Sequence, residues 1–223
     1  MKINDNIIKN DVDAENQTRE KVKIVESENP LAKRVLFLGN SITLHETKPE
    51  IGWGVNWGMA ASAEEKDYVH IVLKALQKRY KDVSYAVVNV GEWELNYWKE
   101  GVIDKFKMAR DFKADIIIFR FGENVNLQQL EQYPLAPYLA QFMKYLNVCA
   151  EKAIVTDTFW EHDYICQTLK NVAEENGYTF AVISDLGYAD ENKALGLFEN
   201  PSVAAHPGDL GMERIAQRII EKL

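Results

Sequence analysis

Five short apolar runs place the strongest constraint on how this chain can fold. They span residues 35–39, 83–90, 115–121, 152–157 and 178–184 and are rich in β-branched and aromatic residues. Because apolar residues follow one another instead of alternating with polar ones, the runs are typical of strands buried on both faces of a parallel sheet. Helix-like segments accompany them, at 62–80, 98–112, 134–152, 164–177 and 208–223.

Strand and helix alternate through most of the chain, and this order predicts the fold class. Parallel strands require crossover connections, which are right-handed and usually helical. The sequence therefore predicts an α/β fold: a three-layer α/β/α sandwich around a five-stranded parallel sheet. The expected strand order is flavodoxin-like, and it places the first and third strands side by side.

Composition and charge narrow the domain organisation and the partners. Residues 1–30 are polar and predict an N-terminal arm, whereas 31–223 predict one domain. The net charge of −8 argues against nucleic acid or an anionic membrane as a partner. No apolar stretch suits a membrane span or the core of a signal peptide, so the expected location is cytoplasmic. The composition predicts no particular oligomeric state.

The chemistry is expected where the strand order reverses, outside the carboxyl ends of the strands. Gly39-Asn40-Ser41 follows the first strand, and Gly122-Glu123-Asn124 follows the third. These two ends are neighbours in the predicted sheet, so Ser41 and Asn124 should lie side by side. His206, which precedes the last helix, can fold back over the same edge.

Serine, histidine and asparagine together are typical of an acyl-transfer site. A serine hydroxyl becomes a strong nucleophile when an imidazole takes its proton. A side-chain amide and backbone N–H groups can hold the oxyanion, and each such donor lowers the barrier by about 3–4 kcal/mol. The prediction is that Ser41 is the nucleophile, His206 the base and Asn124 an oxyanion donor.

Three motifs together resemble a known family. They are VLFLGNSIT at the first strand, the Gly-x-Asn ending at Asn124, and the His-Pro before the last helix. Over residues 33–223 the chain resembles the SGNH (GDSL-type) hydrolase superfamily. The resemblance implies a three-layer fold, Ser41 as nucleophile and His206 as base, with no cofactor and no metal. It also implies an oxyanion hole formed by the Ser41 amide, a backbone amide after the second strand and Asn124.

The chain departs from the family pattern at three positions. Asn40 stands where an Asp usually precedes the serine. The glycine that supplies the second oxyanion amide aligns with Glu94, with Gly91 close by as the alternative. Val203 replaces the Asp that usually lies three residues before the histidine, so no obvious carboxylate orients His206.

Three outcomes of this missing carboxylate stay open. A backbone carbonyl in 202–204 accepts the imidazole N–H and gives a Ser–His dyad. A carboxylate from another loop, Glu94, Glu123 or Asp157, replaces the Asp. Otherwise the protein is a weak or inactive catalyst that keeps the pocket to bind carbohydrate.

Tryptophans suggest the substrate. All five lie after predicted strands, on the expected active face, and aromatic rings suit sugar rings. Together with the resemblance, they predict removal of a small acyl group, acetyl first, from a carbohydrate or similar polyol, a small-molecule or glycan ester. The predicted substrate contacts are Asn40, Trp53, Trp57, Trp93 and Trp160.

Other candidate sites receive simpler interpretations. His45 could touch substrate, while His70 is expected to pack within a helix. The stretch Glu161-His162-Asp163 is interpreted as a solvated rim, because three adjacent ligand types rarely form a metal site. A nucleotide or flavin site is disfavoured, since the loop after the first strand has no glycine-rich phosphate cradle.

Overall fold

A six-stranded mixed sheet forms the centre of the computed structural model, which describes residues 21–223. The strand order is β1-β3-β2-β4-β5-β6. β1 pairs antiparallel with β3, and every other neighbouring pair is parallel. The strands are β1 (Val22–Val25), β2 (Lys33–Gly39), β3 (Val83–Asn89), β4 (Ile116–Arg120), β5 (Lys152–Thr156) and β6 (Thr179–Ala181).

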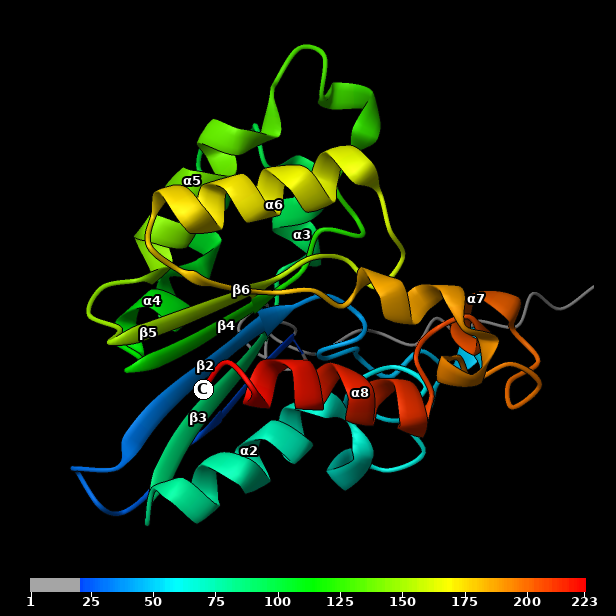
Figure 1. The fold of residues 1–223 in the computed structure, drawn as a ribbon, viewed down its shortest axis with the longest axis horizontal. Helices are drawn as coiled ribbons and strands as arrows, with labels where there is room; N and C mark the ends of the chain where they lie inside the picture. The colour runs from blue at the N-terminus through cyan, green and yellow to red at the C-terminus, as the bar shows by residue number, and fades with distance from the viewer. Residues whose placement is uncertain (1–20) are drawn as a thin grey trace, which may run out of the picture.

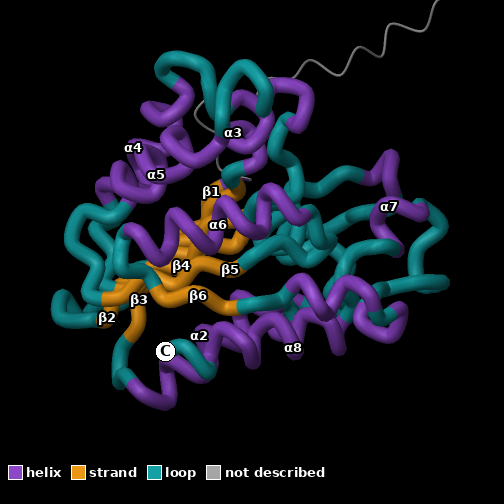
Figure 2. Tube along the Cα trace, turned by 45° about the horizontal axis from the view of Figure 1, so that its top comes forward, coloured by secondary structure: helices purple, strands orange, loops and turns teal. Residues whose placement is uncertain are grey.

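Helices cover both faces of this sheet (Figures 1 and 2). On one face lie α3 (Gly91–Asn96), α4 (Lys107–Asp111), α5 (Leu135–Leu146) and α6 (Asp163–Glu175). On the other lie α2 (Tyr68–Arg79) and α8 (Asp209–Ile220), and α7 (Pro201–Ala204) stands beyond one end of the sheet. Short 3₁₀ turns occur at Pro49–Ile51, Glu64–Lys66, Val102–Phe106, Leu127–Gln129, Ser184–Tyr188 and Asp190–Asn192.

The predicted α/β sandwich is confirmed, with one strand more than the sequence indicated. The five predicted strands are β2 to β6, and their order is flavodoxin-like. The extra strand, β1, lies within residues 1–30, which were predicted as an arm. It is an edge strand of four residues, VKIV, in which Lys23 interrupts the apolar residues. Ile24 and Val25 are 40% and 45% exposed, so the strand lacks the continuous apolar sequence of a buried strand. Residues 1–20 of the predicted arm lie outside the described part of the chain.

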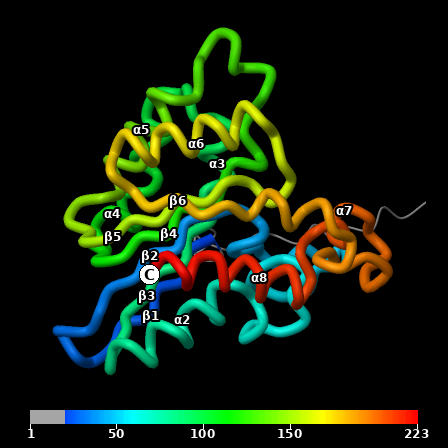
Figure 3. The backbone as a smooth tube through the Cα atoms, in the orientation of Figure 1, coloured from blue at the N-terminus to red at the C-terminus, as the bar shows by residue number. Residues whose placement is uncertain are grey.

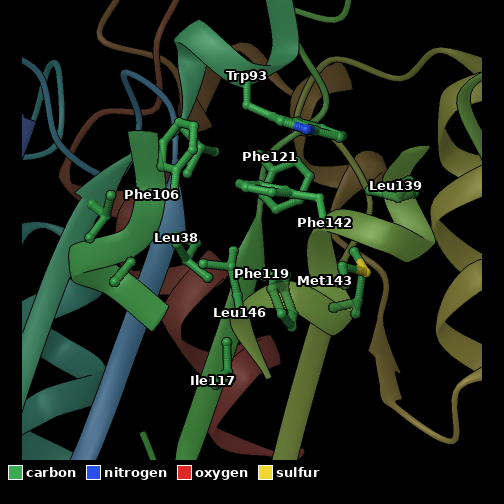
Figure 4. Packing of buried hydrophobic residues seen from close by; sticks show 14 of the residues in the cluster. Leu38, Trp93, Phe106, Ile117, Phe119, Phe121, Leu139, Phe142, Met143 and Leu146 are labelled. Carbon is green, nitrogen blue, oxygen red and sulfur yellow. The ribbon is translucent and has the colours of Figure 1, made fainter. Parts of the chain in front are cut away.

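Strand residues alternate between two apolar cores, which explains the continuous runs in the sequence. Leu36 and Leu38 pack with α3, α5 and α6, in the cluster shown in Figure 4. Val35 and Phe37 pack with α2 and α8 on the opposite face. Both faces are therefore apolar, and burying each such side chain contributes about 1.5–3 kcal/mol.

Two short helices, α3 and α7, do not appear in the sequence prediction, because so few residues carry no helical period. The helix predicted from residue 62 begins later, at Tyr68, where the Asp67 carboxylate accepts the His70 backbone N–H at 2.8 Å. Figure 3 follows the chain to its end after α8, where the Leu223 carbonyl accepts a hydrogen bond from Arg79. Within residues 21–223, no helix has the length and apolarity needed to cross a membrane.

Candidate active site

The adjacent strands β3, β2 and β4 end at the same level of the sheet, and the loops that follow them lie in one region. Gly39 at the end of β2 pairs with Asn89 of β3 on one side and Arg120 of β4 on the other. Gly39 is required here, because a Cβ would lie 1.7 Å from the Thr43 Oγ1 atom in the turn that follows. Gly122 after β4 has a φ of +137°, which other residues rarely adopt. The predicted switch point is therefore present, with Ser41 directly after β2.

Ser41 and His206 come together at this point although 165 residues separate them. The Ser41 Oγ atom lies 2.8 Å from His206 Nε2. A hydrogen bond to the following loop holds the Ser41 backbone in place, because the Ser41 carbonyl accepts the Met59 backbone N–H at 2.8 Å. Trp160 packs edge-on against the imidazole, with 5.0 Å between the ring centroids. The geometry suits transfer of the serine proton to the imidazole.

The other imidazole nitrogen faces a backbone carbonyl. His206 Nδ1 lies 2.7 Å from the Ser202 carbonyl oxygen, within the turn that ends α7. A carbonyl only accepts, so Nδ1 carries the hydrogen and Nε2 is left to accept from Ser41. Burial lowers the pKa of His206 to about 4, although the Ser202 carbonyl opposes that shift. The imidazole is therefore neutral at neutral pH and able to act as a base.

Within residues 21–223, the His206 ring hydrogen-bonds to Ser41 and to the Ser202 carbonyl, and to none of the carboxylates considered from the sequence. Val203 is fully buried in an apolar cluster with Trp53 and Met59. Glu94 accepts the Gly122 N–H, Glu123 accepts the Phe159 N–H, and Asp157 accepts bonds from Ser184 and Ile183. Of the arrangements left open by the sequence, the backbone carbonyl is the one whose geometry is present.

Two hydrogen-bond donors beside Ser41 are suited to hold an oxyanion. Within residues 21–223, the Ser41 backbone N–H has no hydrogen-bond partner. Asn124 is exposed, and its Nδ2 atom carries two hydrogens, of which one donates to Glu94 Oε2 at 3.1 Å. The second hydrogen stays available to a ligand.

The structure does not favour either candidate for the second oxyanion amide, because both N–H groups already have hydrogen-bond partners. The Gly91 N–H donates to the Asn89 side-chain oxygen at 2.9 Å. The Glu94 N–H donates to the Val90 carbonyl at 3.1 Å within α3, and Glu94 is fully buried. The short helix α3, which the sequence did not reveal, uses the Glu94 N–H, and the Asn89 side chain uses the Gly91 N–H.

A buried polar cluster lies behind Ser41 and corrects the prediction for Asn40. Asn40 is 1% exposed, so it does not reach a ligand in the pocket. Its Nδ2 atom donates to Glu123 at 2.6 Å and Glu94 at 3.2 Å, and its Oδ1 atom accepts from Arg120 at 2.6 Å. Arg120 also donates to Glu123 at 2.7 Å. We call Asn40, Glu94, Arg120 and Glu123 the buried cluster.

Ser41 and His206 open into a pocket of about 580 Å³. Its wall combines amide, charged and apolar side chains from the loops after β2 and β3, from α3 and from α7. The lining residues are Lys21, Ser41, His45, Glu46, Ile51, Met59, Asn89, Gly91, Glu92, Leu95, Asn96, Asn124, Ser202, Val203 and His206. The predicted contact residue His45 is among them, and burial lowers its pKa.

The predicted tryptophan platform is wrong as a description of this pocket. Trp93 is fully buried and stacks on Phe142 at 4.4 Å (Figure 4), and Trp53 is 2% exposed. Trp57 donates its indole N–H to the Ala61 carbonyl at 3.0 Å. Trp160 contacts His206 but does not line the pocket. Trp93 and Trp53 are core residues because α3 and the loop after Ser41 turn their apolar side chains inward.

The pocket residues that sequence reasoning missed are mainly polar. Asn89, Glu92 and Asn96 surround the pocket, and each follows or lies near the end of β3. Ser202 was not missed: it lies in the 202–204 stretch whose backbone carbonyls the sequence offered as one partner for His206. Within residues 21–223, no group of three or more His, Cys, Asp or Glu side chains is arranged to hold a metal ion.

Comparison with known proteins finds similar folds among solved structures. One is a protein from Desulfitobacterium hafniense DCB-2 assigned to the G-D-S-L family of lipolytic proteins. It is 14% identical with a TM-score of 0.48, over 86% of this chain and 99% of that chain. A second structure is 13% identical with a TM-score of 0.49, over 85% and 95%. No protein-family model and no curated protein matches the chain.

The likeness to the G-D-S-L protein concerns the fold alone.

Proposed function

We propose that this protein is a serine ester hydrolase that uses a Ser41–His206 dyad. The observation that carries the proposal is that the His206 imidazole makes two hydrogen-bond contacts, one through each ring nitrogen. Ser41 Oγ lies 2.8 Å from Nε2, and Nδ1 lies 2.7 Å from the Ser202 carbonyl. This arrangement orients a neutral base toward a hydroxyl at the wall of an open pocket.

The reaction follows from the positions of these groups. His206 Nε2 takes the Ser41 proton while Oγ forms a bond to the ester carbonyl carbon. The carbonyl oxygen becomes negative and accepts hydrogen bonds from the Ser41 N–H and the Asn124 Nδ2 group. His206 then returns the proton to the leaving alcohol as the ester bond breaks. Water, activated by the same imidazole, hydrolyses the acyl-serine and restores the enzyme.

The carbonyl partner sets an upper limit on the rate. An aspartate beside Nδ1 would stabilise the imidazolium that forms in the transition state by its negative charge. The Ser202 carbonyl supplies only a dipole, and burial also disfavours the charged imidazole. We therefore expect turnover slower than that of an enzyme with a complete Ser-His-Asp triad.

Polar groups around the pocket support a polyol as the alcohol part of the ester. Asn89 and Asn96 contribute amides, and Glu46 and Glu92 contribute carboxylates. Such groups exchange hydrogen bonds with the hydroxyls of a carbohydrate. We propose an acetylated carbohydrate or a similar polyol ester as substrate, with no cofactor.

A second candidate is a carbohydrate-binding protein with little or no catalysis. It is favoured by the Gly91 N–H, which is already bonded to Asn89, and by Val203 in place of a carboxylate. In that case the pocket would bind a ligand without activating Ser41.

Hydrolysis of p-nitrophenyl acetate separates the two candidates. Wild type, Ser41→Ala and His206→Ala are compared, with His70→Ala as a control histidine outside the pocket. The esterase proposal expects turnover by wild type and His70→Ala, and background rates from the other two. A fluorophosphonate probe should label wild type and not Ser41→Ala. Equal rates for wild type and Ser41→Ala, together with absent labelling, would overturn it.

A further inference from the structure

The buried carboxylate of Glu94 makes an unusual set of contacts next to the proposed oxyanion site. Its Oε1 atom accepts the backbone N–H of Gly122 at 2.6 Å and that of Asn124 at 3.2 Å. The Asn40 amide also donates to Oε1, at 3.2 Å. Its Oε2 atom accepts from Asn124 Nδ2 at 3.1 Å. Glu94 thus receives N–H donors from the loop that carries Asn124 and from the turn before Ser41.

No cation neutralises this carboxylate within the described residues. The Arg120 guanidinium, the cation of the buried cluster, pairs with Glu123 and donates to Asn40 instead. Burial, together with the negative charge of Glu123, raises the pKa of Glu94. A buried carboxylate is costly unless hydrogen bonds compensate it, so placing one here needs the four donors around it.

The contact with Asn124 determines which way its side-chain amide faces. If the amide turned over, its oxygen would lie against the Glu94 oxygen, and two acceptors would repel each other. The observed orientation instead keeps Nδ2 on the side of Gly91, a residue that lines the pocket with Ser41. One Nδ2 hydrogen is held by Glu94, and the other is directed away from it.

We infer that Glu94 is a positioning residue that holds the Asn124 amide with its N–H toward the oxyanion. The inference rests on the proposed esterase function and deepens it. Two bonds to the backbone of the Gly122–Asn124 turn and one to the Asn124 side chain fix both the loop and the amide. Glu94 itself does not line the pocket and touches no substrate.

A double-mutant cycle tests this inference. Asn124→Ala should lower kcat by about 10²–10³, the usual effect of removing an oxyanion donor. In Glu94→Gln the oxygen still accepts the two backbone N–H groups, so the new NH₂ group faces Asn124 Nδ2. Because two donors then oppose each other, kcat should fall at least about 10-fold with little change in KM. Adding Glu94→Gln to Asn124→Ala should cause no further loss.

The matched control is Glu123→Gln. Glu123 is also a buried carboxylate of the cluster, but its bonds go to Arg120, Asn40 and the Phe159 N–H. This variant should lower thermal stability and keep kcat close to wild type. Losses that multiply in the double mutant, or an unchanged kcat in Glu94→Gln, would show that Glu94 does not act through Asn124.

A measurement on the wild-type protein remains informative if Glu94→Gln does not fold. In ¹⁵N–¹H spectra, the Asn124 side-chain signals are assigned by their disappearance in Asn124→Asp. One of the two hydrogens should be shifted downfield and exchange slowly, because it is bonded to a buried carboxylate. Two rapidly exchanging hydrogens would overturn the inference. Absence of Ser41-dependent turnover in wild type would instead count against the esterase proposal, which the spectra do not test.

Discussion

Two histidines of this chain, His70 and His206, each place Nδ1 at hydrogen-bond distance from an oxygen atom, but the oxygen belongs to a different kind of group in each. His70 Nδ1 lies 2.8 Å from the buried carboxylate of Asp67, whereas His206 Nδ1 lies 2.7 Å from the Ser202 carbonyl. The carboxylate–histidine pair that a serine hydrolase normally uses is therefore present, but on α2. There the His70 Nε2 atom lies 3.6 Å from the Glu64 carboxylate, and no hydrogen bond joins the His70 ring to a serine within residues 21–223.

The comparison shows that the partner of Nδ1 does not by itself create a catalytic base. Asp67 serves the fold, because it also caps α2 and accepts the Gly58 N–H at 3.2 Å. His206 has the weaker, uncharged partner, yet its Nε2 atom faces a serine in a pocket. A nucleophile beside Nε2 is what distinguishes the two sites. The following predictions test that distinction.

Replacing His206 with Gln should have the largest effect. Glutamine can still hydrogen-bond to Ser41 but cannot take its proton, so general-base catalysis is lost. We expect the kcat/KM for p-nitrophenyl acetate to fall about 10³-fold, within the usual range for general acid–base catalysis. Thermal unfolding should change little, because His206 is only half-buried. If His206→Gln kept most of the wild-type activity, His206 would not be the catalytic base, and it would no longer differ from His70 in function.

The pH dependence of activity should be displaced toward acid. His206 must be neutral to act as a base, and burial lowers its pKa from 6.5 to about 4. Activity is therefore lost only as the pH falls through about 4, so kcat/KM at pH 5 should stay near its plateau. The free energy of unfolding should also fall at acid pH. The unfolded chain takes up this proton near pH 6.5 and the folded protein only near pH 4, so His206 lowers stability progressively between these two pH values.

The check is a pH–rate profile of kcat/KM between pH 3.5 and 8, corrected for the spontaneous hydrolysis of the ester. Unfolding is followed over the same range, so that loss of the fold is not mistaken for titration. A midpoint near 6.5 would indicate a solvated imidazole and contradict the geometry around His206.

The sequence predicted the central sheet from its short apolar runs, and the meeting of Ser41 with His206 from the topology of that sheet together with the family resemblance. Runs such as 35–39 and 115–121 locate parallel strands, and the topology of such sheets brings their ends together. Edge strand β1 was missed because it is short and half-exposed. Helices α3 and α7 were missed because six and four residues carry no usable period.

The unpredicted helix α3 accounts for part of the errors in the site. α3 turns Trp93 into the core and uses the Glu94 N–H, so neither acts as predicted. α7 presents the Ser202 carbonyl to His206, which is the backbone option that the sequence left open for 202–204, although the residue types did not show which carbonyl it would be. The Ser41–His206 pair and the 202–204 carbonyl could be predicted from spacing, whereas the use of the Glu94 N–H depended on α3, a local helix that the sequence did not reveal.

Replacing Asp67 with Ala should affect stability more than activity. The change removes the α2 cap and leaves the buried Gly58 N–H without its acceptor. Together these losses should cost about 2–3 kcal/mol of unfolding free energy. Urea unfolding measures the cost, and the Ser41-dependent rate at 25 °C should persist. Asp67→Asn, which still caps the helix, should lose less. A large fall in kcat without a fall in stability would mean that Asp67 serves the site directly.

Replacing His70 with Ala should have the smallest effect. The side chain gives up its bond to Asp67 and its edge-on contact with Tyr85, whose ring centroid is 6.3 Å away. The backbone cap of α2 stays intact, because it uses the His70 N–H and not the imidazole. We expect a loss of about 1 kcal/mol in urea unfolding and wild-type kcat/KM. If His70→Ala instead lost as much activity as His206→Gln, the Asp67–His70 pair on α2 would contribute to catalysis at Ser41. The conclusion that only His206 acts in catalysis would then be wrong.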